Sequence, residues 1–150
     1  MQTIAFDDLS KLVGQDIGAS DWVTIDQDRI NKFADATGDH QWIHIDVERA
    51  KTELPGGKTI AHGYLTLSLV PMLSAQILRV TGVSRGINYG SNKVRFTSMV
   101  PVGSNVRGRQ KVLSVAPRGS GMEIISEMTI EIEGQDRPAC VAETIGLVFK

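Results

Sequence analysis

Polar and apolar residues alternate regularly in the second half of the chain. Within residues 122–133, the even positions are mostly apolar and the odd positions are mostly glutamate or threonine. A period of two is typical of a strand with one buried face and one solvated face. Extended runs also cover residues 87–96, 104–115 and 139–149, and turns rich in glycine and proline separate them. The pattern therefore predicts four long antiparallel strands.

The first half of the chain has helical spacing instead. Apolar residues recur every three or four positions within residues 6–13, and Gly14 follows as a stop. A second amphipathic segment begins after Asp26, which is a suitable N-cap, and ends at Gly38. Both segments are predicted to be helices that cover one side of the sheet.

Asp46 precedes one further predicted turn of helix over residues 47–50, and residues 53–58 are predicted to be a loop. Residues 63–80 are apolar on nearly every side, which is typical of a buried central helix. Pro71 lacks an N–H group, so a kink is expected there. The apolar stretch also contains His62, Pro71, Gln76 and Arg79, which favours a core helix over a membrane span.

Four strands after one long helix predict an α+β fold, an antiparallel sheet with its helices on one side. No internal repeat or linker divides the chain, so residues 1–150 are predicted to form a single domain. The edge strand of such a sheet leaves backbone N–H and C=O groups unpaired. Dimerisation through that edge would satisfy them, so we expect a homodimer.

Composition narrows the classes of partner. The 150 residues carry 16 Lys and Arg against 17 Asp and Glu, giving a formal net charge of −1. A near-neutral chain has no global attraction for nucleic acid or for anionic membrane, and neither is expected as a partner. The single cysteine, Cys140, excludes an internal disulfide and is expected to be a buried, inert thiol. The first residues lack a basic region followed by an apolar one, which predicts a cytoplasmic protein.

All three histidines lie within 23 residues of one another, at positions 40, 44 and 62. His40 and His44 have the i, i+4 spacing of helical zinc ligands, but no Glu follows His40 and the segment is predicted to be a loop. Catalytic zinc normally needs three protein ligands with supporting hydrogen bonds, so no metal is expected.

Asp39 and His44 lie five residues apart, just after the predicted helix stop at Gly38. A carboxylate and an imidazole that face one cleft can hold and deprotonate a water molecule. The structural alternative is that Asp39 caps a turn and His44 only packs. Spacing alone does not decide between these two interpretations.

Gly63 marks the predicted start of the central helix, where the first backbone N–H groups lack acceptors. An oxyanion would be stabilised there, because glycine allows a ligand oxygen to approach the backbone. The alternative is that glycine simply fits a tight helix entry.

These residues carry a family resemblance. The run FADATGDHQWIH at residues 33–44, followed by Ala50 and by IAHG at residues 60–63, resembles the MaoC-like, (R)-specific enoyl-CoA hydratases. The match is closest to the NodN-like branch, and the chain from about Trp22 onward looks like a short mycobacterial-type hydratase. The resemblance implies a hotdog fold, an antiparallel sheet wrapped around a long central helix.

The resemblance also implies a reaction, the reversible addition of water to a trans-2-enoyl-CoA to give an (R)-3-hydroxyacyl-CoA. Asp39 would take a proton from the attacking water, His44 would orient that water and help to protonate C2, and the Gly63 N–H would bind the thioester oxygen. Such an enzyme is a hydro-lyase that acts on an acyl-CoA thioester and needs neither a metal nor a redox cofactor. His62 and Gln41 are expected to contact substrate.

Arg95 is a candidate for the CoA phosphates, although solvated strand faces usually carry such charges as well. Where the family usually has Asn-Pro, this chain has Gln41-Trp42, which supplies a longer amide and removes the rigid proline. Two other functions remain open at this point. One is a hotdog thioesterase, since the same amide and carboxylate would serve hydrolysis; the other is a hotdog domain that binds acyl thioesters without turnover.

Overall fold

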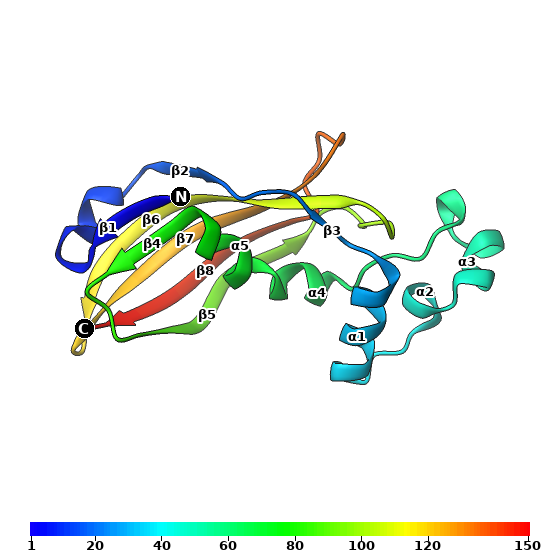
Figure 1. Cartoon of the computed structure of the whole chain (residues 1–150), viewed down its shortest axis with the longest axis horizontal. Coiled ribbons are helices and arrows are strands. Elements are labelled where there is room, and N and C mark those ends of the chain that lie inside the picture. The colour runs from blue at the N-terminus through cyan, green and yellow to red at the C-terminus, as the bar shows by residue number, and fades with distance from the viewer.

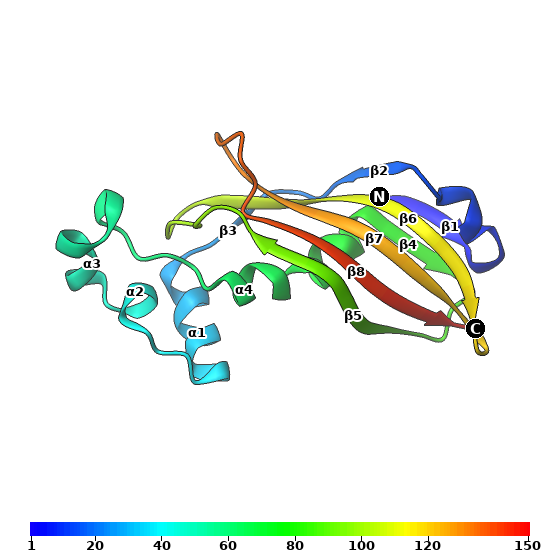
Figure 2. The ribbon, with the colours of Figure 1, turned by 180° about the vertical axis from the view of Figure 1, so that it is seen from behind.

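A bent antiparallel sheet forms one layer of the molecule, and all helices of the α type lie on one side of it or at its end (Figures 1 and 2). The computed structural model describes all 150 residues. The main sheet has the strand order β2-β6-β7-β8-β5, and β3 pairs with β6 beyond the end of β2. The strands of this sheet are β2 (Asp16–Ala19), β3 (Val23–Thr24), β5 (Arg85–Phe96), β6 (Asn105–Arg118), β7 (Gly121–Ile132) and β8 (Cys140–Phe149). This arrangement is the α+β hotdog fold expected from the sequence.

The four long strands agree with the alternation of the sequence, with one correction. Pro117 and Arg118 belong to β6, where Pro117 pairs with Met122 and Arg118 with Gly121, whereas the sequence placed them in the turn. The turn is therefore tighter than predicted, because only Gly119 and Ser120 remain outside the strands.

The two faces of β7 confirm the predicted amphipathic strand. Ile124, Met128, Ile130 and Ile132 are buried beneath the helices. On the opposite face, Arg107 and Arg118 of β6 pair with glutamates of β7. A period of two therefore separates the hydrophobic core from the charged surface.

The central helix is shorter than predicted, and this is the main correction to the fold. Helices α4 (Gly63–Ser68) and α5 (Val70–Ile77) meet at a break around Leu69, two residues before Pro71. Residues 78–81 are strand β4 (Leu78–Thr81), which pairs in parallel with β1 (Gln2–Ala5). The pairing with β1 explains why the chain leaves the helix at this point. Hydrogen bonds to β1 satisfy the backbone N–H and C=O groups of residues 78–81, which helical hydrogen bonds would otherwise have to satisfy.

The central helix is also not apolar and buried on every side. Tyr64 is 69% exposed and Met72 is 39% exposed, while Leu65 and Leu73 pack on the sheet. The protomer thus leaves an apolar stripe of α4 and α5 uncovered.

The N-terminal segment after β1 is a short 3-10 helix, η1 (Phe6–Leu12), which buries Leu9 and Leu12 against β6 and β7. The predicted stop at Gly14 is confirmed, since Gly14 has a φ of 82°. The helical spacing of the sequence placed Val13 on the buried face with Leu9, but the 3-10 helix ends at Leu12, and Val13 after it is 46% exposed.

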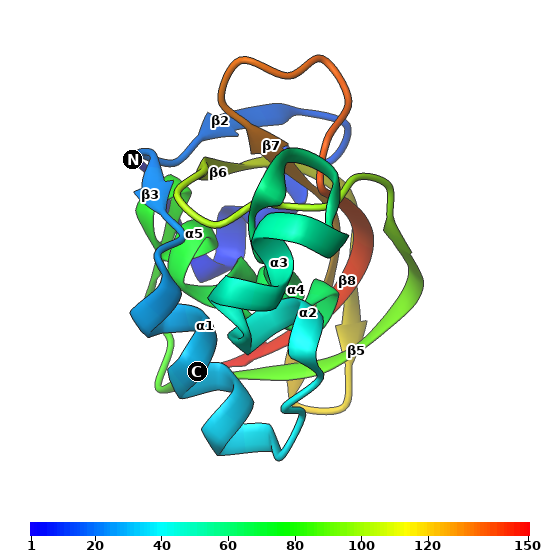
Figure 3. The same cartoon turned by 90° about the vertical axis from the view of Figure 1, so that its right-hand side faces the viewer.

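The remaining helices gather at one end of the sheet, beside the start of α4 (Figures 1 and 3). They are α1 (Gln27–Thr37), α2 (Trp42–Ile45), α3 (Val47–Glu53) and the 3-10 turn η2 (Pro55–Gly57). Asp26 and Asp46 cap α1 and α3 by accepting hydrogen bonds from Arg29 N and Arg49 N, as predicted. The α2 turn lies where a loop was expected, and α3 extends three residues beyond the predicted turn.

No helix in the structure is both long enough and apolar enough to cross a bilayer.

Candidate active site

The end of α1 places Asp39 at the mouth of the site. Gly38 closes the helix in the left-handed conformation, with a φ of 78° and its N–H donating to the Ala34 carbonyl. The chain then reverses direction, and Asp39 Oδ1 accepts a hydrogen bond of 3.4 Å from Gln41 N. The Asp39 side chain remains 51% exposed, so water can reach its carboxylate.

His44 is held by two hydrogen bonds. Its Nδ1 lies 2.7 Å from the Ile60 carbonyl oxygen, to which it must donate, so Nε2 is left as an acceptor. Gln27 donates from Nε2 to the His44 carbonyl at 2.7 Å, and the Thr59 hydroxyl donates to Gln27 Oε1 at 2.5 Å. Burial lowers the pKa of His44, with the hydrogen bond to Ile60 acting in the opposite direction. The ring is therefore fixed and neutral, with one lone pair available.

His62 connects the two candidate catalytic residues. Its ring stacks on that of His44 at 3.8 Å between centroids, with 24° between the planes. Its Nε2 donates to the Asp39 carbonyl oxygen at 3.0 Å. The ring is only 2% exposed, and its Nδ1 is buried without a hydrogen-bond partner. His62 thus contacts both the backbone of Asp39 and the ring of His44 from inside the protein.

These contacts bring three side chains together. One carboxylate oxygen of Asp39 and one ring nitrogen each of His44 and His62 lie within 4.8 Å of one another. One water molecule bridges such a gap between a carboxylate and an imidazole with two hydrogen bonds of about 2.8 Å each. The geometry therefore suits a single water bound between Asp39 and His44.

The same donor atoms suit a metal less well. Nitrogen lone pairs lie in the imidazole plane, and the stacked, nearly parallel rings of His44 and His62 do not direct theirs toward one point. His40, the other half of the possible zinc pair, instead lies 2.9 Å from Asp35 on the surface. That hydrogen bond raises the pKa of His40.

An open cavity of about 680 Å³ borders His44 and Gly63. Its other walls come from the loop after α3, the segment after β5 and the loop before β8. Asp39 and His62 do not line it. The Asp39 side chain is exposed to solvent, and the buried ring of His62 stacks on that of His44.

Gly63 is the first residue of α4, so its N–H has no acceptor within the helix. A Cβ added at Gly63 would lie 2.9 Å from the ring of Phe96, so no side chain fits at this position. Close packing against Phe96 therefore requires glycine at this position.

The remaining predicted residues lie around this centre. Gln41 is exposed and is the N-cap residue of α2, where its carbonyl accepts from His44 N at 3.0 Å. Arg95 lies on the exposed edge strand β5 and donates from Nη1 to the Val94 carbonyl. It does not line the cavity, although the next residue, Phe96, does. Cys140 is fully buried, and burial raises the pKa of its thiol to about 11, as expected for an inert core residue.

Sequence reasoning missed three residues that shape the site: Gln27, Thr59 and Phe96. Gln27 and Thr59 form the chain of hydrogen bonds that holds the backbone of His44, although 17 and 15 residues separate them from it. Phe96 covers Gly63 from the end of β5. No local pattern marks these residues, because their contacts arise only when distant segments pack together.

Comparison with known proteins identifies the family. The family profile described as "MaoC like domain" matches residues 8–131. The 3-hydroxyacyl-thioester dehydratase Z of Mycobacterium tuberculosis is 53% identical over 139 residues, which cover 92% of this chain and 91% of that protein. Nodulation protein N of Rhizobium leguminosarum bv. viciae is 43% identical over 150 residues, covering 99% of this chain and 93% of that protein.

Solved structures agree on the fold. The unliganded R-hydratase PhaJ1 from Pseudomonas aeruginosa superimposes with a TM-score of 0.70 at 24% identity, covering 92% of this chain and 82% of that chain. The (R)-hydratase from A. caviae gives a TM-score of 0.71 at 24% identity, covering 89% of this chain and 94% of that chain. With the sequence relationships above, the chain therefore belongs to the MaoC-like family of dehydratases, a family of hydro-lyases with the hotdog fold.

Proposed function

We propose that this protein is an (R)-specific enoyl-CoA hydratase, which reversibly adds water to a trans-2-enoyl-CoA to give an (R)-3-hydroxyacyl-CoA. The observation that carries the proposal is the Asp39 and His44 pair, in which a carboxylate oxygen and a ring nitrogen lie within 4.8 Å, a separation that one water molecule bridges. The dehydratase and R-hydratase names of the relatives support the same reaction and its stereochemistry.

Asp39 and His44 have different roles in the proposed reaction. The carboxylate of Asp39 accepts one proton of the water as the water oxygen attacks C3 of the enoyl group. His44 Nε2 accepts a hydrogen bond from the remaining water proton and orients the nucleophile, while its Nδ1 is held by Ile60. The pair then returns the abstracted proton to C2, so the elements of one water molecule are added across the double bond.

The amide of Gly63 completes the proposed site. Attack at C3 places negative charge on the thioester oxygen, and the Gly63 N–H donates to that oxygen from the start of α4. Gly63 and His44 border the same cavity, so a thioester carbonyl at Gly63 places its double bond near His44. Gln41 and His62 support this site through Asp39, since the Gln41 N–H donates to the Asp39 carboxylate and His62 Nε2 donates to the Asp39 carbonyl.

The carrier would leave the cavity beside two arginines. Arg137 lines the cavity, and Arg95 lies one residue from Phe96 on the exposed edge strand. Both cations are available for the phosphates of CoA.

A homodimer is part of the proposal. Strand β5 is the edge of the main sheet, and 11 of its 12 residues are exposed in the protomer. Its backbone groups and the uncovered side chains Tyr64 and Met72 would be satisfied by a second copy.

One assay separates hydration from hydrolysis. The purified protein is incubated with crotonyl-CoA, and the loss of conjugated absorbance is followed together with the release of free thiol. We expect absorbance to fall with no thiol release. Thiol release without hydration would instead identify a thioesterase, and binding without either change would identify a non-catalytic protein.

The Asp39→Asn variant tests the proposed base. We expect hydration to fall by about 10²–10⁴-fold, because an amide cannot accept the proton. Circular dichroism and the dissociation constant for butyryl-CoA should stay close to wild type. Asp35→Asn is the matched control, since Asp35 is an exposed carboxylate of the same helix end that pairs only with His40. Unchanged turnover in Asp39→Asn would show that another group is the base.

A further inference from the structure

A second cavity lies between α5 and the concave face of the sheet, away from the histidines. It has a volume of about 630 Å³, within the range of small-molecule binding sites. Its apolar walls come from α5 and from the strands opposite. Its lining residues include no Asp, Glu, Lys, Arg or His, so the cavity suits an uncharged ligand.

Glycines create the space on the strand side. Gly86, Gly90 and Gly146 all line the cavity. A Cβ at Gly90 would meet nothing within 4 Å, and one at Gly146 would meet nothing closer than 3.9 Å. Gly146 lies on the same face of β8 as the buried Ala142, so a side chain added there would enter the cavity.

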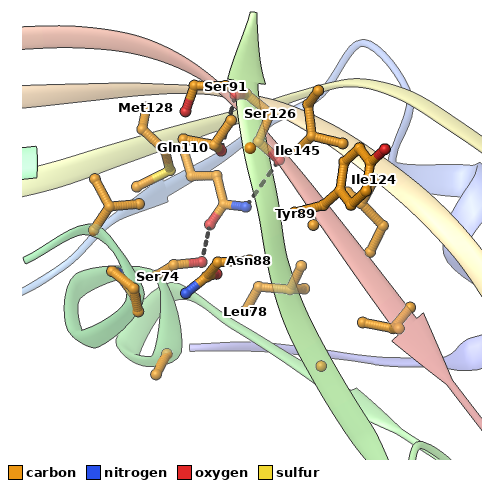
Figure 4. Close-up of a pocket in the computed structure, with 18 of the residues that line it drawn as sticks. Ser74, Leu78, Asn88, Tyr89, Ser91, Gln110, Ile124, Ser126, Met128 and Ile145 are labelled. Atoms are coloured by element: carbon orange, nitrogen blue, oxygen red, sulfur yellow. Dashed lines mark hydrogen bonds between the residues drawn. The ribbon is translucent and has the colours of Figure 1, made fainter. Parts of the chain in front are cut away.

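The floor of the cavity is polar, although it is deeply buried. Gln110 of β6 accepts a hydrogen bond at Oε1 from the Ser74 hydroxyl at 2.7 Å and donates from Nε2 to Ser126 Oγ at 3.1 Å. Figure 4 shows Gln110 reaching between Ser74 and Ser126, with Asn88 beside Ser74. Gln110 is 5% exposed and Ser126 is 4% exposed.

These bonds leave hydrogen-bond donors unused. Gln110 has a second amide hydrogen, and the Ser126 hydroxyl hydrogen has no acceptor in the structure. A hydrocarbon placed over them would exclude water and leave both donors unpaired, which is unfavourable. A ligand oxygen at this point would accept from them.

The two cavities are bordered by adjacent residues of one helix. Gly63 and Thr66 line the cavity that contains His44, and Leu67 and Ser68 line the second one. Ser74 lies roughly 16 Å farther along the helices than Gly63, a distance that an acyl chain of roughly a dozen carbons would span. Arg137 lies at the first cavity, so the phosphates of the carrier belong on that side and the acyl tail on the other.

We propose that the second cavity binds the distal part of a long acyl chain and selects chains that carry a neutral oxygen function, a hydroxyl or keto group, near Gln110. The inference rests on the proposed hydratase function for the orientation of the thioester. It assigns Gln110, with Ser74 and Ser126, as a specificity-determining group for that substrate.

Equilibrium binding of saturated acyl-CoA thioesters tests the inference without requiring turnover. The probes are dodecanoyl-CoA, 12-hydroxydodecanoyl-CoA and butyryl-CoA, measured by calorimetry. We expect the hydroxylated chain to bind about tenfold more tightly than the plain chain, since it pairs a buried donor that the plain chain leaves unpaired. Equal or weaker binding of the hydroxylated chain would overturn the inference.

Two variants locate the effect. Gln110→Leu keeps the side-chain size and should reduce the tenfold preference to near unity or reverse it; Ser126→Ala is the second variant if Gln110→Leu does not fold. Gly146→Leu should weaken both long chains relative to butyryl-CoA by filling the cavity. Lys111→Leu is the matched control, because Lys111 follows Gln110 on the opposite, exposed face of β6, and it should leave the preference unchanged.

The outcomes separate this inference from the proposed reaction. If the wild-type protein does not hydrate crotonyl-CoA but still prefers the hydroxylated chain, the proposed hydratase function is wrong and the proposed acyl-tail site stands. If Gly146→Leu leaves long-chain binding unchanged, or alters only the mass of the dimer, the cavity does not hold the acyl tail and the inference is wrong.

Discussion

At the scale of single residues, His62 has the most constrained environment in the site. Its ring carries a stacking contact to His44, a hydrogen bond to the Asp39 carbonyl and a buried nitrogen without a partner. An unpaired buried polar atom costs about 1–3 kcal/mol of folding stability. His62 therefore destabilises the fold while it holds Asp39 and His44 in place.

His62→Phe separates those contributions. Phenylalanine keeps a ring against His44 but loses the hydrogen bond to Asp39 and the unpaired nitrogen. We expect the melting temperature to stay equal or rise, while kcat falls by roughly tenfold with little change in KM, because Asp39 loses a positioning contact worth about 0.5–1.5 kcal/mol. Thermal denaturation and steady-state kinetics check both parts. A parallel loss of stability and activity would mean that His62 is only a packing residue.

The lowered pKa of His44 predicts the response to acid. In the unfolded chain a histidine titrates near about 6.5, whereas burial keeps the folded His44 neutral below that value. Between the two values the unfolded state binds more protons, so His44 contributes stability that is present above about pH 6.5 and is lost as pH falls through its folded pKa. Urea denaturation across this range, with His44→Gln as the comparison, should show a smaller acid-dependent loss in the variant. Turnover should fall at lower pH, as the pH reaches the lowered pKa of folded His44, because protonated Nε2 no longer accepts from water.

At the scale of elements, the start of α4 is fixed by contact with β5. Gly63 lies under Phe96, and a Cβ there would approach the ring to 2.9 Å. The end of the edge strand therefore sets where the helix begins, and with it the position of the amide proposed to bind the thioester oxygen.

Gly63→Ala should displace Phe96 and shift that amide. We expect a loss of hydration of about 10²–10³-fold, the typical effect of removing one oxyanion donor. Gly63→Ala combined with Phe96→Ala removes the ring that the new methyl group meets. Partial recovery in the double variant would support displacement of Phe96 as the cause; no recovery would indicate that the methyl group itself blocks the ligand.

At the scale of the whole molecule, the uncovered edge of the sheet remains the main open surface. Strand β5 is exposed along its length, and Ile87 on it is 46% exposed. The unpaired backbone groups of an exposed edge strand are a template for pairing with another chain.

Light scattering should therefore give twice the chain mass of 16.3 kDa. Ile87→Lys should shift the mass toward the monomer, because a charge on the edge opposes pairing. Val13→Lys is the matched control, since Val13 is equally exposed but lies outside the edge strand. A monomeric wild type, or equal effects of the two variants, would contradict dimerisation through β5.

Local sequence patterns were enough to predict the four long strands, the helix after Asp26 and the candidate site residues. Alternation placed the four long strands, capping residues placed α1 and α3, and the Asp39, His44 and Gly63 positions followed from local motifs. These features depend on short segments of the chain, so local propensity and hydrophobic periodicity are enough to predict them.

Tertiary structure alone decided where the central helix stops, what holds His44 and how the cavities are shaped. The pairing of β4 with β1 ended the helix early, Gln27 and Thr59 held the backbone of His44, and His62 proved to be buried against the ring of His44. Each of these depends on contacts between segments far apart in the chain. Such contacts contribute free energy only in the folded protein, so no local sequence pattern indicates them.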